Sequence, residues 1–329
     1  MNIEPNSAFA KHMFTPKSIS DSLDVPRSTL YEYLKSNEGE LETTQVKVGN
    51  SNRKLYDWNI LAKISSELKS KFPEPQDKTK VFINQKGGVG KTTISTQFAM
   101  RAACAGKKVL FIDIDPQGHS TFAFGLPNDH GVVPTMREAF EGRMSVEEII
   151  VEICPLLHLV PSNPDLSNVE LMLRTEFNGT FKLKKLLKDL KPKYDLIVID
   201  TNAGPLWITI NGILCAEEIC VVCQTEMYSV NGLKGMFDLI SSLEDAYDSF
   251  EPNVRIIPNL YAGQTVEAQK AIGFIRTKYE DLVTDIAVRS DAEMKNAQGQ
   301  KQAVHLYKNN SNISKDIDAL TRELLNDVD

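Results

Sequence analysis

The sequence predicts an α/β protein with a doubly wound, mostly parallel β-sheet and a second, smaller domain at the N-terminus. From residue 79 onward, short β-branched runs alternate with helix-length amphipathic segments. A glycine-rich loop follows the first of these runs directly. A charged stretch with two prolines, KFPEPQDK at 71–78, has the composition of a linker between two domains. We therefore predict domains at 1–74 and 75–329.

The composition indicates the class of protein. The chain has 329 residues, 42% of them hydrophobic and 25% charged, which suits one large domain and a small one. The formal net charge of −7 provides no global positive field, so contact with nucleic acid has to come from local patches. The five cysteines are scattered, and no segment looks like a signal peptide or a membrane span. We expect a cytoplasmic protein without a disulfide framework.

The N-terminal domain has the pattern of a winged helix-turn-helix. Residues 14–34 are typical of two short helices around a turn, with Pro26 at the start of the second helix. Residues 43–58 follow as strand, turn and strand, and Asp57 is placed to cap a third helix. This layout resembles the MerR-type DNA-binding fold.

In such a fold the second helix enters the major groove, and the wing meets phosphate or the minor groove. The predicted DNA-binding residues are Arg27, Ser28, Thr29 and Tyr31 on the helix and Arg53 and Lys54 on the wing. Residues 1–78 hold 11 basic and 11 acidic residues, so the domain is neutral overall. A protein-docking module is the alternative to a specific DNA-binding domain.

The larger domain has six segments that are typical of buried parallel strands, at 81–84, 108–115, 157–161, 195–200, 218–224 and 254–259. The segments between them imply right-handed helical crossovers, and ligands in such sheets bind at the carboxyl ends of the strands. Cys220 and Cys223 form a C-x-x-C within one strand, so they point to opposite faces and are predicted to be core residues.

The first strand runs into QKGGVGKTT at residues 85–93, a phosphate-binding loop that is followed by a helix. Its glycines let backbone N–H groups face phosphate oxygens, and the helix N-terminus adds its dipole. Lys91 is expected to neutralise the β/γ-phosphates of ATP, and Thr92 to hold Mg²⁺. The predicted nucleotide-binding residues of this loop are Lys86, Gly87, Gly88, Val89, Gly90, Lys91, Thr92 and Thr93.

Acidic residues end two further strands. Asp113 and Asp115 lie on the same side of their strand, before a turn that lets a carboxylate face the γ-phosphate. Asp200 closes an apolar strand as a Walker B aspartate does, placed to bind Mg²⁺ through water. An aspartate at a strand end can instead cap the next helix. Asn259, at the end of the last strand, completes the predicted nucleotide-binding residues.

Three stretches, KGGVGKTT, IDIDPQGHST and VVCQTEMYSVNGLKGM, resemble the ParA/MinD group of deviant Walker A ATPases, and most closely the ParA-type partition ATPases. The resemblance covers residues 79 to about 310. It implies that Lys86, the extra lysine before the glycines, crosses a dimer interface to the partner's nucleotide, so that ATP drives a sandwich homodimer. We predict Lys86, Lys91 and Asp115 as catalytic residues, and the resemblance assigns Asp115 to the attacking water.

The chain departs from this group in one loop and differs from two of its branches. After Asp200, where Pro-Pro is common, it has Thr201, Asn202, Ala203 and Gly204. MinD-like members end in a basic membrane-binding helix, whereas this chain ends in the acidic KDIDALTRELLNDVD, so we expect no membrane binding. Relatives of nitrogenase reductase need cysteines for an iron–sulfur cluster, and the C-x-x-C here does not fit one.

In ParA-like proteins, basic residues in the C-terminal part of the dimer bind DNA without sequence preference. The candidates here are Lys270, Arg276 and Arg289. The resemblance thus implies an ATP- and Mg²⁺-dependent plasmid or DNA partition protein that associates with the nucleoid. A ParB-like centromere-binding partner would stimulate slow hydrolysis, and the N-terminal domain would bind operator DNA for autoregulation. Two alternatives stay open, an ATP-gated transcriptional regulator and a ParA-like ATPase that positions a protein cargo.

Overall fold

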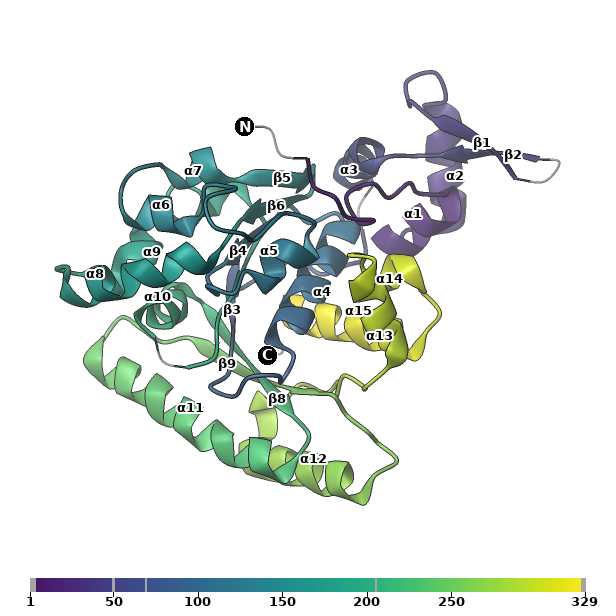
Figure 1. The fold of residues 1–329 in the computed structure, drawn as a ribbon. Helices are drawn as coiled ribbons and strands as arrows, with labels where there is room; N and C mark the ends of the chain where they lie inside the picture. Colours follow the sequence, from purple (N-terminus) through teal and green to yellow (C-terminus); the bar gives the residue numbers. More distant parts are fainter. Residues whose placement is uncertain (1–3, 49–50, 69, 205, 327–329) are drawn as a thin grey trace.

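The structure is a computed structural model that describes residues 4–48, 51–68, 70–204 and 206–326. Its centre is a seven-stranded sheet with helices on both faces (Figure 1). The strand order is β5-β6-β4-β7-β3-β8-β9, and all neighbouring pairs are parallel except β5 and β6. The predicted doubly wound, mostly parallel sheet is therefore confirmed.

Six strands are those that the sequence predicts, with slightly shifted ends. They are β3 Thr79–Ile83, β4 Val109–Asp113, β6 Leu157–Val160, β7 Leu196–Asp200, β8 Glu218–Gln224 and β9 Asn253–Asn259. The edge strand β5, Val151–Cys154, was not predicted. It has only four residues and pairs with β6 through a tight turn, so its run is too short for periodicity to identify.

The register of the sheet brings the acidic strand ends together. Asp113 of β4 pairs with Asp200 of β7, and Asp200 also pairs with Phe82 of β3. The glycine loop follows β3 directly. Both aspartates and the loop therefore meet at the carboxyl edge of the sheet, where parallel sheets bind ligands.

Alternation along each strand divides the core into two clusters, one on each face of the sheet. Phe111 of β4 belongs to one cluster, and its neighbours Leu110 and Ile112 belong to the other. Cys220 and Cys223 of β8 likewise lie in different clusters, and both are buried thiols. The prediction that this C-x-x-C pair is part of the core is confirmed.

Different helices cover the two faces of the sheet. The first cluster is covered by α4 Lys91–Cys104, α13 Ala292–Gly299, α14 Val304–Tyr307 and α15 Asn312–Leu325. The second is covered by α6 Met136–Phe140, α7 Val146–Ile149, α8 Glu170–Thr175, α9 Lys182–Leu186, α10 Trp207–Cys215, α11 Met227–Ala246 and α12 Val266–Tyr279. The short helix α5, His119–Ala123, follows β4 at the carboxyl edge.

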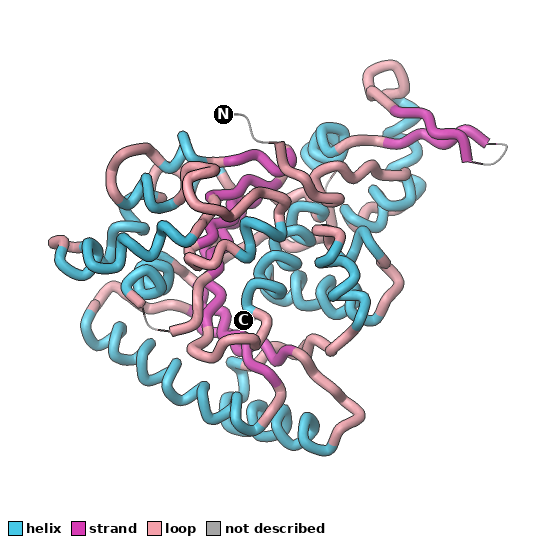
Figure 2. The backbone as a smooth tube through the Cα atoms, in the orientation of Figure 1, coloured by secondary structure: helices cyan, strands magenta, loops and turns pink. Residues whose placement is uncertain are grey.

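The N-terminal residues form the predicted order of elements. They are α1 Pro16–Leu23, α2 Arg27–Ser36, the antiparallel strands β1 Thr44–Val48 and β2 Ser51–Leu55, and α3 Trp58–Glu67. A capping box of Thr15 and Ser18 starts α1, and the Asp57 side chain accepts a hydrogen bond from the backbone N–H of Ile60 in α3. The β1–β2 hairpin projects away from the rest of the molecule (Figure 2).

The N-terminal elements share a hydrophobic core with the sheet and its helices. Phe9, Trp58 and Leu61 belong to the same buried cluster as Phe98 of α4 and Leu320 of α15. The stretch at 71–78 is irregular, as expected of a linker, but it is anchored, because Phe72 is only 3% exposed. Removing the N-terminal part would therefore expose core side chains of the larger one.

Arg101 connects three parts of the molecule. This α4 side chain is 1% exposed, and its guanidinium stacks on the ring of Phe72 at 4.1 Å. It donates a 3.0 Å hydrogen bond to the carbonyl of Ser22 in α1 and pairs with Asp318 of α15 at 2.6 Å. Arg322 of α15 stacks on the same ring at 4.0 Å. The helix that begins at the glycine loop thus contacts both α1 and α15.

We expect Arg101→Ala to lower the free energy of unfolding by about 2–4 kcal/mol, because the buried Ser22 carbonyl loses its donor and Asp318 keeps only Arg322 of its two arginine partners. Urea unfolding of the full chain measures this. Arg174→Ala, which removes an exposed arginine of α8, is the control and should change stability by less than about 0.5 kcal/mol. Equal stability of the two variants would contradict the role of Arg101.

Candidate functional site

The glycine loop, residues 84–90, joins β3 to α4. Gly88 and Gly90 have φ values of +76° and +90°, a region that favours glycine. A Cβ on Gly90 would also lie 2.3 Å from Nδ2 of Asn259. That Nδ2 donates a 2.8 Å hydrogen bond to the carbonyl of Val89. The end of β9 therefore braces the loop, and the close approach requires glycine at position 90.

Asn84 braces the other end of the loop, a role that the sequence analysis missed. Its Nδ2 donates to the carbonyl of Val222 in β8 at 2.6 Å, and its Oδ1 accepts from the backbone N–H of Lys86 at 2.8 Å. The side chain is only 4% exposed. A polar residue directly after an apolar strand, three positions before the first glycine, was the available signal.

A cavity of about 730 Å³ opens at the loop, a volume in the range of small-molecule sites. Its lining includes seven of the predicted residues, Gly87, Gly88, Gly90, Lys91, Thr92, Thr93 and Asp115. It also includes residues that were not predicted, Pro116, Gln117, His119, Ser167, Asn202, Ala203 and Leu206. A smaller cavity of about 170 Å³ adjoins the loop beside Asn259.

Lys91 is largely removed from water at the start of α4. The side chain is 7% exposed, and burial lowers the pKa of its ammonium group, while Asp200 and Asp115 act in the opposite direction. An ammonium group in this position gains from an anionic ligand, which would compensate for the lost solvation.

Asp200 has the environment of a cation ligand. Its Oδ2 accepts hydrogen bonds from the hydroxyls of Thr92, at 2.8 Å, and Ser120, at 2.6 Å, while the buried Oδ1 has no partner among the described residues. Burial raises the pKa of Asp200 to about 6, although both hydroxyls lower it. An unpartnered carboxylate oxygen beside a threonine hydroxyl fits the hard oxygen ligands that Mg²⁺ requires. Ser120, which was not predicted, follows the PQG turn.

The nucleotide contact predicted for Asp113 stays a prediction. Like Asp200, Asp113 is fully buried and does not line the cavity, but unlike Asp200 it has partners for both carboxylate oxygens. Its oxygens accept from the N–H and hydroxyl of Thr121, both at 2.8 Å, and from the N–H of Asp115 at 3.0 Å. Burial, followed by the charge of Asp200, raises its pKa well above the usual range. Because β4 ends at Asp113, the chain turns there, and only Asp115 reaches the cavity.

Asp115 lines the cavity with its side chain 9% exposed. One carboxylate oxygen accepts a 2.9 Å hydrogen bond from the backbone N–H of Gln117, and the Asp115 carbonyl accepts one from the hydroxyl of Ser162 at 2.7 Å. These bonds hold the carboxylate at the cavity wall, in a position where it can contact a bound water.

Lys86 is not part of the cavity lining of its own chain. Its Nζ lies 3.7 Å from Oε2 of Glu226, the residue before α11, and both side chains are a little under half exposed. The geometry thus places this second lysine at the surface beside the site.

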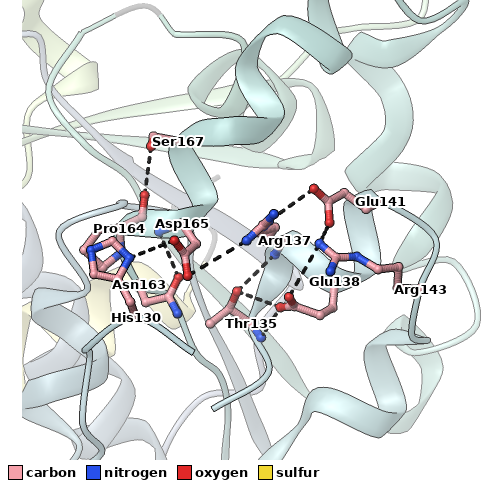
Figure 3. Close-up of polar contacts among 10 residues, drawn as sticks. All are labelled: His130, Thr135, Arg137, Glu138, Glu141, Arg143, Asn163, Pro164, Asp165 and Ser167. Atoms are coloured by element: carbon pink, nitrogen blue, oxygen red, sulfur yellow. Dashed lines mark hydrogen bonds and ion pairs between the residues drawn. The ribbon is translucent and has the colours of Figure 1, made fainter. Parts of the chain in front are cut away.

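An ion-pair network supports the wall of the cavity that carries Ser167 (Figure 3). Ser167 belongs to the 3₁₀ helix η1, Pro164–Val169. Asp165 of this helix contacts His130 at 2.7 Å and Arg137 of α6 at 3.9 Å, and Arg137 also pairs with Glu141 at 3.1 Å. α6 and η1 are therefore joined through Arg137 and Asp165 (Figure 3).

The loop after Asp200 forms another wall of the cavity, through Asn202 and Ala203. The Thr201 hydroxyl donates to the carbonyl of Phe82 at 2.8 Å, and Asn202 Oδ1 accepts from the hydroxyl of Thr209 in α10 at 2.6 Å. Polar side chains of Thr201 and Asn202 therefore hold this loop in place.

The candidate DNA residues of the N-terminal part lie on its surface. Arg27, Ser28, Thr29 and Tyr31 are exposed on α2, while Leu30 and Leu34 of the same helix are buried. On the hairpin, Arg53 is exposed, and Lys54 is half-buried in an ion pair with Glu38. Their role in DNA binding stays a prediction.

The three C-terminal candidates have different environments. Lys270 and Arg276 are exposed on α12. Arg289 forms a two-pronged ion pair with Asp316 of α15, which raises the pKa of the guanidinium. Asp316 compensates its charge, although the Arg289 side chain is still 43% exposed. A role of Arg289 in DNA binding stays a prediction.

Among the described residues, no group of three or more His, Cys, Asp or Glu side chains is arranged to hold a metal ion. No helix in the same residues is both long and apolar enough to cross a bilayer.

Comparison with known proteins agrees with this geometry. Residues 77–256 match the family described as an AAA domain. The chain is 29% identical over 246 residues to the cell division protein PomZ of Myxococcus xanthus, covering 74% of this chain and 77% of that protein. It is 28% identical over 250 residues to the chromosome-partitioning ATPase Soj of Treponema pallidum, covering 75% and 97%.

Solved structures share the fold. The ATP complex of a single-substitution variant of McdA from Cyanothece aligns with a TM-score of 0.69 and 24% identity, covering 76% of this chain and 97% of the other. Cobyrinic acid a,c-diamide synthase from Mycobacterium smegmatis, with an ATP analogue and magnesium bound, aligns with a TM-score of 0.61 and 25% identity, covering 70% and 92%. With a family match over more than half of its length, the chain belongs to the AAA-domain family and is an ATPase of the ParA/MinD type.

Proposed function

We propose that this ATPase binds ATP with Mg²⁺ in the 730 Å³ cavity and uses it to partition DNA. The observation that carries the nucleotide assignment is the buried Lys91 ammonium beside the unpartnered oxygen of Asp200. Lys91 would contact the β/γ-phosphates, and Thr92 and Asp200 would hold Mg²⁺, which screens charge on the phosphates when bound. Asn259, beside the smaller cavity, would border the base.

Asp115 would position the water that attacks the γ-phosphate. Its carboxylate lines the cavity, and its orientation is set by Gln117 and Ser162 rather than by the nucleotide. Asp113 would act only through Asp115 and Thr121, as a positioning residue.

Lys86 would act on a second subunit. Because it lies outside the cavity of its own chain and beside Glu226, it is placed to reach a nucleotide presented by a partner across the loop. In a homodimer with ATP between its subunits, the Lys86 of each subunit would complete the site of the other. The dimer would therefore form only when ATP is bound.

Two surfaces would serve DNA. The exposed face of α2, with Arg27 and Tyr31, would read operator DNA, and Lys270 and Arg276 of α12 would bind nucleoid DNA without sequence preference. A ParB-like partner would stimulate hydrolysis and release the dimer. A ParA-like ATPase that positions a protein cargo is the alternative to DNA partition.

An ATP-gated transcriptional regulator is a second candidate function, favoured by one contact. Arg101 binds the Ser22 carbonyl of α1 from the helix that begins at Lys91. A shift of α4 on nucleotide binding would reach the helix-turn-helix directly. In this function, operator binding would depend on ATP, and a partner would change hydrolysis little.

Lys91→Ala should weaken ATP binding by about two orders of magnitude, because the phosphates lose a buried charge-assisted contact. Isothermal titration calorimetry with a non-hydrolysed ATP analogue and Mg²⁺ measures this. Lys188→Ala, which removes an exposed lysine in the turn after α9, is the control. Unchanged affinity of the Lys91 variant would remove the nucleotide assignment.

Lys86→Ala should leave ATP binding to the monomer largely intact and yet weaken ATP-dependent dimerisation and hydrolysis, because its proposed target lies in the other subunit. Light scattering with and without ATP gives the mass of the complex. A full-strength ATP dimer with normal turnover would show that Lys86 is an ordinary surface lysine.

Asp115→Ala should retain ATP and accumulate the dimer while hydrolysis falls roughly 100-fold or more, as expected for loss of a group that positions water. Phosphate release measures turnover. The control is Asp129→Ala, which removes an exposed carboxylate. Loss of ATP binding in the Asp115 variant would contradict the role in water positioning.

Point variants should separate the two DNA surfaces, since deletion of the N-terminal part would expose core residues. Arg27→Ala should reduce the preference for operator DNA by about 1–3 kcal/mol and spare bulk DNA binding. Arg276→Ala should weaken ATP-dependent binding to all sequences and reduce its salt dependence. If each variant impaired both kinds of binding equally, the assignment of two surfaces would be wrong.

A further inference from the structure

A polar groove separates α1 from the C-terminal helices. It consists of two adjoining cavities of about 390 and 530 Å³, which share residues of α1 and of the loop between α14 and α15. The shared residues include Lys17, His305 and Asn309. One end of the groove opens at Arg27, the first residue of α2.

The groove is positively charged. The smaller of its two cavities is lined by four cations, Lys17, Arg27, Lys315 and Arg322, but by only two carboxylates, Asp21 and Asp318. The buried His305 adds no charge at neutral pH, because burial lowers its pKa to about 3.

The two arginines and the two lysines of this cavity differ in how their charges are compensated. Arg322 pairs with Asp24 at 3.1 Å and with Asp318 at 3.0 Å. Arg27 lies 3.8 Å from Asp21. Lys17 and Lys315 are exposed and pair with no carboxylate of the described residues.

A buried hydroxyl in the same groove also lacks a partner. Ser314, in the first turn of α15, is 1% exposed, and its Oγ makes no hydrogen bond within the described part of the chain. Its backbone N–H is capped by Ser311 at 3.2 Å. A hydroxyl donor at the N-terminus of a 14-residue helix, next to Lys315, forms an arrangement that suits a phosphate oxygen.

We propose that this groove binds a backbone phosphate of the DNA held by α2, so that α15 of the ATPase part contributes to operator binding. The inference rests on the proposed operator function. In helix-turn-helix complexes the first helix crosses the DNA backbone while the second enters the major groove, which would bring phosphate to Lys17 and to the start of α2. Lys315 and Ser314 face the same groove from the opposite wall.

The position of Arg27 favours DNA over a free anion as the source of the phosphate. Its side chain is 59% exposed and leads from the groove to the exposed face of α2. The groove is also elongated over two cavities, and its free cations lie on both walls rather than around one closed centre.

The test uses the full-length protein and a duplex selected from a random-sequence library by repeated binding to the wild type. Affinity is measured by fluorescence anisotropy at several salt concentrations for the wild type, Lys17→Gln, Lys315→Gln and the double variant. Lys188→Gln removes an exposed lysine in the turn after α9 and is the matched control. In Figure 1, α9 lies on the opposite side of the molecule from α1, α14 and α15.

Each groove variant should bind the selected duplex roughly 3- to 10-fold more weakly, with a salt slope smaller by up to about 0.9, because one phosphate contact is lost. The preferred sequence should not change, since phosphate contacts carry no base information. Thermal unfolding and ATP turnover should equal those of the wild type, which separates the effect from loss of structure.

Affinity and salt slope equal to those of the Lys188 variant would overturn the phosphate site and leave operator binding by α2 intact. No selectable duplex, or a duplex that Arg27→Ala binds equally well, would overturn the operator function and the inference with it. A thermal shift caused by inorganic phosphate that Lys315→Gln abolishes, without any effect of Lys315→Gln on DNA affinity, would show a small-anion site and would also overturn the DNA assignment.

Discussion

The hydrogen bonds of Thr92 and Ser120 to one oxygen of Asp200 organise the carboxyl edge of the sheet. They join the end of β7 to the helix that follows the glycine loop and to the helix that follows β4. All three groups are buried or nearly so, and an ionised carboxylate in that position is costly unless donors or a cation stabilise it. The second oxygen stays without a partner, which is why the architecture points to a bound cation rather than to a purely structural acid.

The same edge shows how similar residues take different roles. Asp113 and Asp115 lie two positions apart, yet the first is buried and accepts three hydrogen bonds within the chain, while the second lines the cavity. Lys91 and Lys86 differ in the same way, since the first is buried and the second lies at the surface. Whether a side chain can contact a bound ligand depends here on the direction of the backbone, which changes within one or two residues.

The helix α4 extends the influence of the nucleotide site beyond the sheet. It begins at Lys91, and near its other end Arg101 contacts Ser22, Phe72 and Asp318. The N-terminal helices and α15 therefore rest on the helix whose first turn forms the nucleotide site. These contacts of α4 are part of the core that the two parts of the chain share. They also connect the nucleotide site to α1, which lies next to the proposed DNA-binding helix α2.

Much of the architecture is already determined by local sequence. Buried apolar runs identify six strands, the glycine loop fixes where a phosphate would bind, and Asp57 marks the start of a helix, because each signal acts over a few residues. The short strand β5 was not predicted, because its four residues are too few for a periodic pattern. Tertiary structure alone decides that Asn84 and Asn259 brace the loop, that Arg289 is matched by Asp316, and that Phe72 anchors the predicted linker. These outcomes depend on partners tens or hundreds of residues away along the chain, and only packing brings them into contact.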